Sequence, residues 1–170
     1  MAVPDLLTHS LLNLVLPWGR LRRDELGVFV FGGVLPDLIS RVPAMALGRW
    51  LQPVLSDDMD IDWFINGFSA LHLPAGYAAA AVFLASALPR FMISASSRLR
   101  VFTLLLGGGL IHLGMDMFQS HLRPAYRYLF PLSLRPMELG WFDPDLGFYS
   151  WPLLVPLAWF AWRRSPRLSK

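Results

Sequence analysis

Cysteine is absent from the 170-residue sequence, and charged residues are scarce at 16%. Without cysteine, the chain can form neither a disulfide framework nor a thiolate metal site. Any transition-metal site must therefore be built from histidine and carboxylate side chains. An ordinary soluble domain carries roughly 25% charged residues, so the low charge argues against a conventional soluble fold.

Several sequence signatures are also missing. No repeat of fixed period occurs, which argues against a solenoid or propeller. Neither a Gly-x-Ser-x-Gly elbow nor a His-Glu-x-x-His helix is present, so the hydrolase classes that need them lack support. No basic stretch precedes the first apolar segment and no small-residue cleavage site follows it. Residues 1–17 are therefore not expected to be a cleaved signal.

Hydrophobic residues make up 55% of the sequence, and they gather in distinct blocks. The length suits a single domain spanning residues 1–170. The apolar blocks are residues 5–16, 26–39, 68–88, 99–118 and 149–162. The third and fourth are long enough to cross a hydrocarbon core of ~30 Å. The first is short, and so is the second unless it extends into its flanks. Pro152 and Pro156 predict a bent or shortened helix in the fifth. The pattern predicts an all-α, multi-span helical membrane bundle of about five helices, some short or re-entrant.

Basic residues flank these blocks in three segments. If the blocks alternate in direction, the three segments share one side of the bilayer. They hold Arg20, Arg22, Arg23, Arg90, Arg98, Arg100, Arg163, Arg164, Arg167 and Lys170. The positive-inside rule makes that side cytoplasmic. Because the arginines flank apolar blocks, the net charge of +3 is read as a topology signal, and no nucleic-acid partner is expected.

Five ionisable side chains fall toward the outward ends of the predicted helices. They are His9, Asp37, His72, His112 and Asp116. At ~1.5 Å per residue four of them share the outer half of the bilayer, and His9 joins them only if its helix sits higher or tilts. Ionisable groups within a span are costly and usually face a bundle interior or an aqueous cavity. Imidazole and carboxylate together suit Zn²⁺, Mn²⁺ or Fe²⁺.

Each of these residues also has a simpler interpretation. A single histidine is about as often a packing residue as a ligand, and Asp37 beside Pro36 could cap a helix end. Asp116 could pair with Arg123 or Arg127. The simpler interpretation needs five separate explanations on one side of the bilayer, which favours a shared site. His112 and Asp116 are spaced i, i+4 and share one helix face.

Glycines accompany this face of the fourth block. Gly108 and Gly109 lie one turn before His112 and would let another helix approach closely.

The ordered motifs resemble those of the bacterial membrane-bound metal-dependent hydrolases. They are Thr8-His9-Ser10, Leu35-Pro36-Asp37, His72 and His112-x-x-x-Asp116. The order of these residues is also similar to the ligand order of zinc-dependent phospholipases C. The resemblance covers roughly residues 5–135, and each motif is short. A bacterial family and the positive-inside rule together predict an integral protein of the inner (cytoplasmic) membrane, with the site facing outward.

The resemblance implies a ligand set. One metal would be held by Asp37, His72, His112 and Asp116, and a second would take His9, with Asp116 bridging the pair. His121 is a further candidate ligand. The family's third motif usually carries two histidines, whereas residues 68–74 carry one, and Ile111 stands where a serine often precedes the fourth motif's histidine. Residues 68–74 and position 111 thus lack one histidine and one serine of the family's motifs.

The predicted function is therefore a membrane-embedded metal-dependent hydrolase acting on phosphoester or lipid substrates. Zinc is the expected cofactor, with manganese or iron as alternatives. Asp37 or Asp116 would orient or deprotonate the attacking water. Two alternatives stay open: a non-catalytic relative with a structural metal, and a small ion or proton transporter that uses the same cluster.

Overall fold

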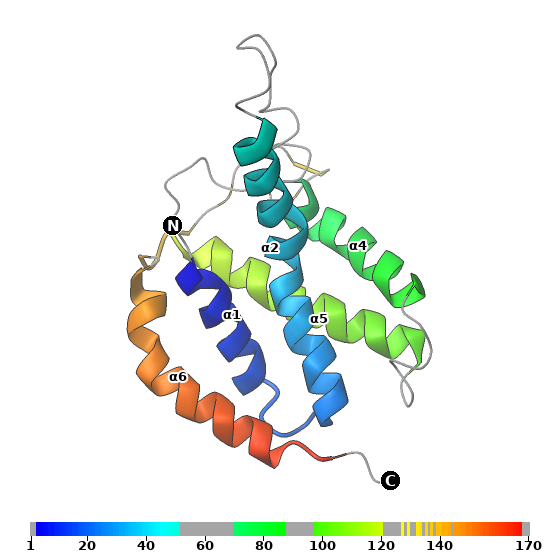
Figure 1. The fold of residues 1–170 in the computed structure, drawn as a ribbon, viewed down its shortest axis with the longest axis vertical. Coiled ribbons are helices and arrows are strands. Elements are labelled where there is room, and N and C mark those ends of the chain that lie inside the picture. The colour runs from blue at the N-terminus through cyan, green and yellow to red at the C-terminus, as the bar shows by residue number, and fades with distance from the viewer. Residues whose placement is uncertain are drawn as a thin grey trace.

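In the computed structural model, the described residues are 3–51, 70–87, 97–120, 127, 129, 132, 133, 135, 137, 139–143 and 145–167. Their regular structure is helical, which confirms the all-α prediction. The helices are α1 (Val3–Val15), α2 (Arg23–Leu51), α4 (Pro74–Ala87), α5 (Arg98–Phe118) and α6 (Asp145–Arg164), with a 3₁₀ turn, η1 (Ala70–His72). Figure 1 shows α2 and α5 crossing near the centre, with α4 beside α5 and α1 between α2 and α6.

Glycines set the spacing between α2 and α5. A Cβ atom added at Gly108 would overlap the carbonyl oxygen of Phe29, and one at Gly32 would overlap that of Leu105. The two backbones therefore touch without intervening side chains, which is the packing that small residues allow. A Cβ at Gly109 would overlap the ring of Tyr77 from α4. The predicted close approach at Gly108 and Gly109 is confirmed.

A buried tyrosine ties α4 to this helix pair. Pro36 lies inside α2 and has no N–H, so it cannot bond the Gly32 carbonyl one turn earlier. The hydroxyl of Tyr77 lies 2.9 Å from that carbonyl and 2.7 Å from the carbonyl of Leu105 on α5. The single hydroxyl hydrogen is shared between the two carbonyl oxygens, and these contacts fix the position of α4, which begins directly after His72 and Leu73.

Helices α1 and α6 pack against each other as a second pair. Leu11 of α1 is buried with Leu154 and Ala158 of α6. The indole N–H of Trp151 donates to the hydroxyl of Thr8 over 3.0 Å, next to His9 in the sequence. α6 holds two prolines and curves along its length in Figure 1, as the fifth block predicted.

The second and third blocks differ in how their helices end. The second block extends into its flanks, because α2 runs from Arg23 to Leu51, and this is the alternative that the sequence left open. The third block is not one full-length helix, since its described part divides into η1 and the 14-residue α4. Pro74 lacks an N–H and is suited to a first helical position, so the α-helix begins there.

Among the described residues, α5 is the one helix whose length and composition suffice to cross a membrane. The fourth block is thereby confirmed as a candidate span. A buried helix of a soluble protein meets the same criterion. Helix α4 is apolar as well, but it is shorter than the length needed to cross a membrane. The multi-span arrangement therefore remains a proposal.

An ion pair joins the first turns of α2 and α5, and its carboxylate, Glu25, lies just before the second apolar block. Arg100 donates from Nε to Glu25 over 2.9 Å. This hydrogen bond lowers the pKa of Glu25 below its ordinary value of 4.5, against the opposing effect of burial. A lowered pKa in the folded state contributes stability above about pH 4.5, and that contribution is lost as the pH falls through the lower value.

We predict that Glu25→Gln removes part of the acid sensitivity of the fold. The wild-type protein should lose more unfolding free energy than the variant between about pH 7 and about pH 3. The difference should stay below about 1 kcal/mol, because Arg100 is 47% exposed and its charge is screened. Chemical denaturation at the two pH values measures it. Equal losses in the two proteins would contradict the prediction.

Candidate metal centre

The five predicted ligands come together at one buried place. His9 is carried by α1, Asp37 by α2, His72 by η1, and His112 and Asp116 by α5. All five are buried, and the most accessible, Asp37, is only 6% exposed. Two sets of three bring their possible ligand atoms within 4.8 Å of one another: His9, His112 and Asp116, and Asp37, His72 and His112. The sequence left the participation of His9 open, and the structure places it in the cluster.

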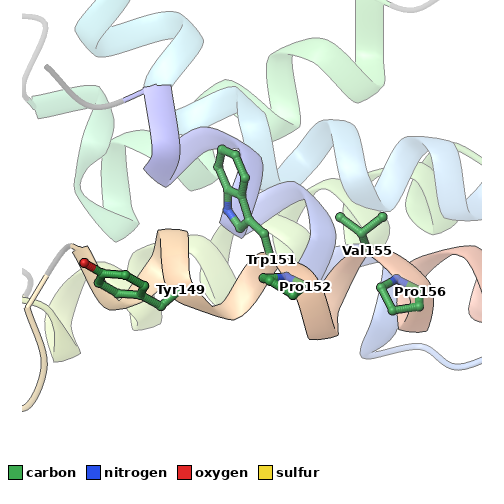
Figure 2. A pocket seen from close by; sticks show the side chains of 5 residues that line it. All are labelled: Tyr149, Trp151, Pro152, Val155 and Pro156. Carbon is green, nitrogen blue, oxygen red and sulfur yellow. The ribbon is translucent and has the colours of Figure 1, made fainter.

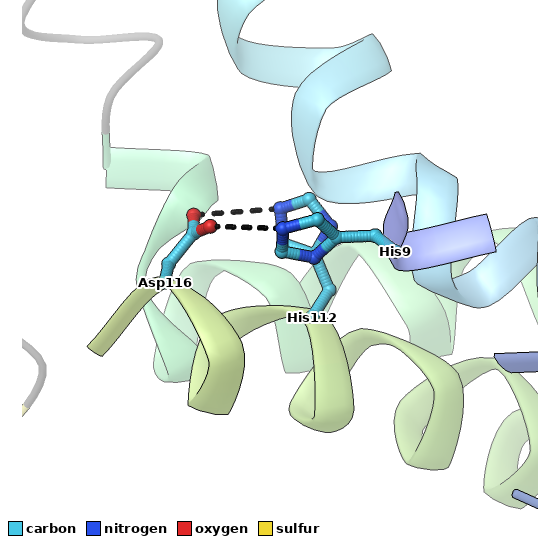
Figure 3. Close-up of side chains that lie close together, drawn as sticks. All are labelled: His9, His112 and Asp116. Carbon is cyan, nitrogen blue, oxygen red and sulfur yellow. Dashed lines mark ion pairs between the residues drawn. The ribbon is translucent and has the colours of Figure 1, made fainter. Parts of the chain in front are cut away.

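Asp116 lies at the centre of the cluster. One carboxylate oxygen, Oδ1, is 3.4 Å from Nε2 of His9. The other oxygen, Oδ2, is 2.6 Å from Nε2 of His72 and 3.5 Å from Nε2 of His112. Figure 3 shows the imidazoles of His9 and His112 side by side, both pointing toward Asp116. The two oxygens of Asp116 thus contact different histidines: Oδ1 contacts His9, and Oδ2 contacts His72 and His112.

The close approach of two imidazoles limits the positive charge that their side chains can carry. The ring centroids of His9 and His112 are 4.0 Å apart, and the ring planes are tilted by 44°. Two imidazolium cations at that distance in a buried site would repel strongly. Two buried carboxylates, Asp37 and Asp116, also require positive charge nearby. One divalent cation would balance both carboxylates and leave the two rings neutral, the form in which histidine binds a metal.

The spacing of the donor atoms suits a metal with one adjustment. Two ligands held about 2.1 Å from a tetrahedral zinc ion lie about 3.4 Å apart. The distances from Asp116 to His9 and His112 agree with this, and that from His112 Nε2 to Asp37 Oδ1 is 3.7 Å. The contact between His72 and Asp116 is a hydrogen bond of 2.6 Å, which would have to open by about 0.8 Å. The residues present fit a metal that takes nitrogen and oxygen ligands.

A serine that the sequence analysis missed orients His72. Ser40 is buried in α2, and its hydroxyl donates to the carbonyl of Pro36 over 2.6 Å. Its single hydrogen is used there, so at 3.1 Å the Ser40 oxygen accepts from Nδ1–H of His72. This tautomer turns Nε2 of His72 toward Asp116 and the cluster. Ser40 follows Asp37 by three residues and thus shares its helix face, which is the sequence signal that could have found it.

We predict that Ser40→Ala weakens metal binding without unfolding the protein. Loss of a hydrogen bond that orients a histidine ligand typically lowers metal affinity about 10- to 100-fold. Ser40→Thr keeps the hydroxyl and should restore most of the affinity. Competition with a fluorescent chelator gives the affinity of each variant. Equal affinities for Ser40→Ala and the wild type would show that the serine does not orient His72.

A separate hollow of about 410 Å³ lies along α6. It is lined by Tyr149, Trp151, Pro152, Val155 and Pro156, and Figure 2 shows Trp151 pointing toward α1. These side chains offer no ligand that a transition metal prefers. Of these two places, the buried cluster is the one whose side chains could hold a metal. His121 falls outside the described residues.

Comparison with protein families, with curated proteins and with solved structures found no match for this chain.

Proposed function

We propose that the protein is an integral membrane metal-dependent hydrolase acting on phosphoester or lipid substrates. His9, Asp37, His72, His112 and Asp116 would hold the metal, with zinc preferred and manganese or iron as alternatives. The observation that carries the proposal is the buried Asp116 carboxylate, which lies within 3.5 Å of nitrogens from three histidines. The motif resemblance to bacterial membrane-bound hydrolases supports the same reading.

The outer surface of the helices supports a membrane location. Large apolar side chains are exposed on every described α-helix, where a soluble protein would place polar ones. They include Leu7 on α1, Phe31 and Leu38 on α2, Phe83 on α4, Leu110 on α5, and Leu153 and Phe160 on α6. Phe83 is 70% exposed and Leu153 is 65% exposed, and their helices, α4 and α6, lie at opposite sides of Figure 1. Lipid chains are the solvent that such a surface suits.

The depth of the cluster indicates which leaflet a substrate would use. From Arg100 to His112, α5 rises about 18 Å at 1.5 Å per residue, and Asp116 lies about 6 Å further. With the basic residues in the cytoplasmic interface, the cluster falls in the outer half of a ~30 Å hydrocarbon core. Reporter fusions are expected to report the cytoplasm after Arg23 and the exterior at Asp143. The opposite pattern would exclude a substrate from the outer leaflet.

The proposed chemistry follows from the charges. A divalent metal lowers the pKa of a bound water and neutralises the charge that develops on a phosphoryl or acyl oxygen. Asp37 is the most accessible of the five residues and is suited to accept a proton from that water. Asp116 orients the histidines through both of its oxygens. Burial keeps competing water away from these groups.

A hydrolysis assay tests the proposal. The purified protein is incubated with bis-p-nitrophenyl phosphate, p-nitrophenyl phosphorylcholine and a fluorogenic phospholipid, each with Zn²⁺, with Mn²⁺ and with chelator. Turnover is expected for at least one of them, to depend on metal and to be abolished in His112→Ala. Thr103→Ala, on the exposed face of the same helix, should retain activity. Metal-dependent turnover that survives His112→Ala would contradict the assignment of the site.

A second function is favoured by the burial of the cluster. Structural metal sites are closed by protein ligands, whereas catalytic sites keep an open position. Five buried candidate ligands, together with the single histidine in residues 68–74, suit a non-catalytic relative that is stabilised by its metal. This alternative predicts bound metal and a metal-dependent melting temperature, without turnover on any substrate of the assay.

A further inference from the structure

The end of the molecule remote from the cluster carries a dense basic surface. The arginines of the loop before α2, of the first turn of α5 and of the end of α6 meet there. Direct contacts bring them together: the amide of Arg23 donates to the carbonyl of Pro166 over 3.1 Å, and Arg100 pairs with Glu25. We call this surface the basic rim. It consists of Arg20, Arg22, Arg23, Arg98, Arg100, Arg163, Arg164 and Arg167.

The positive charge of the rim is largely uncompensated by its own acids. Asp24 and Glu25 are the acidic residues of the described segments that form it, and both are engaged. Asp24 pairs with Arg22 over 3.0 Å, and Glu25 pairs with Arg100 over 2.9 Å. The other six arginines thus leave a surplus of positive charge at this end, and most of their side chains are exposed.

Three tryptophans are interleaved with these arginines. The guanidinium of Arg163 lies 4.2 Å from the ring centre of Trp159, that of Arg23 lies 5.3 Å from Trp162, and that of Arg164 lies 6.0 Å from Trp18. Stacking holds a guanidinium plane in place while its N–H edge stays available to an oxyanion. All three tryptophan side chains are more than one-third exposed.

Apolar side chains adjoin the rim and indicate its setting. Leu16 and Phe160 are both 55% exposed. A nucleic acid would leave these side chains in water, whereas a lipid bilayer accepts apolar chains, tryptophan rings and arginines at successive depths. The occupant that satisfies all three is a phospholipid, and the surplus charge selects one with a net negative head group.

We propose that the basic rim binds the phosphate groups of anionic phospholipids and so anchors this end of the protein in one leaflet. The proposal rests on the membrane location given under Proposed function, and it is independent of the metal. The stacked arginines Arg163 and Arg164 would donate to the lipid phosphate, while Trp18, Trp159 and Trp162 lie at the level of the head groups.

Quenching of tryptophan fluorescence by brominated lipids tests the proposal. The whole protein is reconstituted in phosphatidylcholine vesicles that contain either brominated phosphatidylglycerol or brominated phosphatidylcholine. Stronger quenching by the anionic lipid is expected, weakening in high salt. Arg163→Gln/Arg164→Gln should lower the preference by about fivefold for each charge removed. Arg127→Gln/Arg135→Gln, a matched exposed pair outside the rim, should leave it unchanged.

The outcomes separate this proposal from the one it rests on. Equal quenching by the two lipids would overturn the anionic-lipid site and leave the membrane location standing. An equal loss of preference in the control pair would also overturn it, since net charge alone would then explain the effect. No quenching by either lipid would overturn the membrane location and the rim together. Arg167→Gln, an exposed single change, replaces the double variant if that variant does not fold.

Discussion

Replacing Gly108 by alanine should destabilise the protein by at least about 1–3 kcal/mol, the usual effect of overpacking a tight interface. The added Cβ would overlap the carbonyl oxygen of Phe29, which is backbone and cannot rotate away. Helices α2 and α5 would have to separate. Because α2 carries Asp37 and α5 carries His112 and Asp116, the ligand cluster should open at the same time.

Gly114→Ala is the matched control for this experiment. Gly114 lies on the same helix, and no described atom comes within 4 Å of a Cβ added there. Alanine also favours a helix over glycine by about 1 kcal/mol, so this variant should be as stable as the wild type or more so. Thermal unfolding in detergent measures both. Equal melting temperatures for the two variants would contradict the close packing of α2 on α5.

Asp116→Asn should lower metal affinity by more than about 100-fold. Loss of a residue that only orients a ligand typically lowers it about 10- to 100-fold, and removal of a ligand should cost more. The asparagine has nearly the same shape, so the fold should persist. It lacks the negative charge, and an amide nitrogen replaces one of the two oxygens that contact the histidines. The Zn²⁺ affinity of each protein is measured by competition with a chelator, and samples without added Zn²⁺ serve as the blank.

Asp24→Asn provides the control for the loss of one carboxylate. Asp24 pairs with Arg22 in the basic rim, away from the cluster, and its replacement should leave metal affinity unchanged. If Asp116→Asn bound metal as tightly as the wild type, the central place of Asp116 would be wrong. If both variants lost affinity equally, overall charge and not the cluster would control binding.

The sequence predicted the helical class, the long apolar helix α5 and the close glycine contact, because these depend on local composition. An uninterrupted apolar run predicts a helix, and two glycines beside an ionisable pair indicate where a neighbour packs. It also selected the five residues that the structure brings together. Their roles as ligands and catalysts stay predictions.

The features it did not predict depend on contacts between distant segments. Helix α2 continues past residue 39 to Leu51. The end of an apolar run shows where the side chains become more polar, and it does not show where a helix ends. The height of His9 could not be fixed from the rise along one helix, because α1 is positioned by its packing on α6. Ser40 was missed because its function comes from His72, 32 residues along the chain.

The metal content of the purified protein tests the central claim most directly. Protein reconstituted with Zn²⁺ and freed of excess metal should retain about one or two equivalents, as one or two ligand sets would allow. His112→Ala and Asp116→Ala should each lose most of it. Absence of bound metal after reconstitution with zinc, manganese and iron would contradict the account, leaving the helical fold without a metal centre.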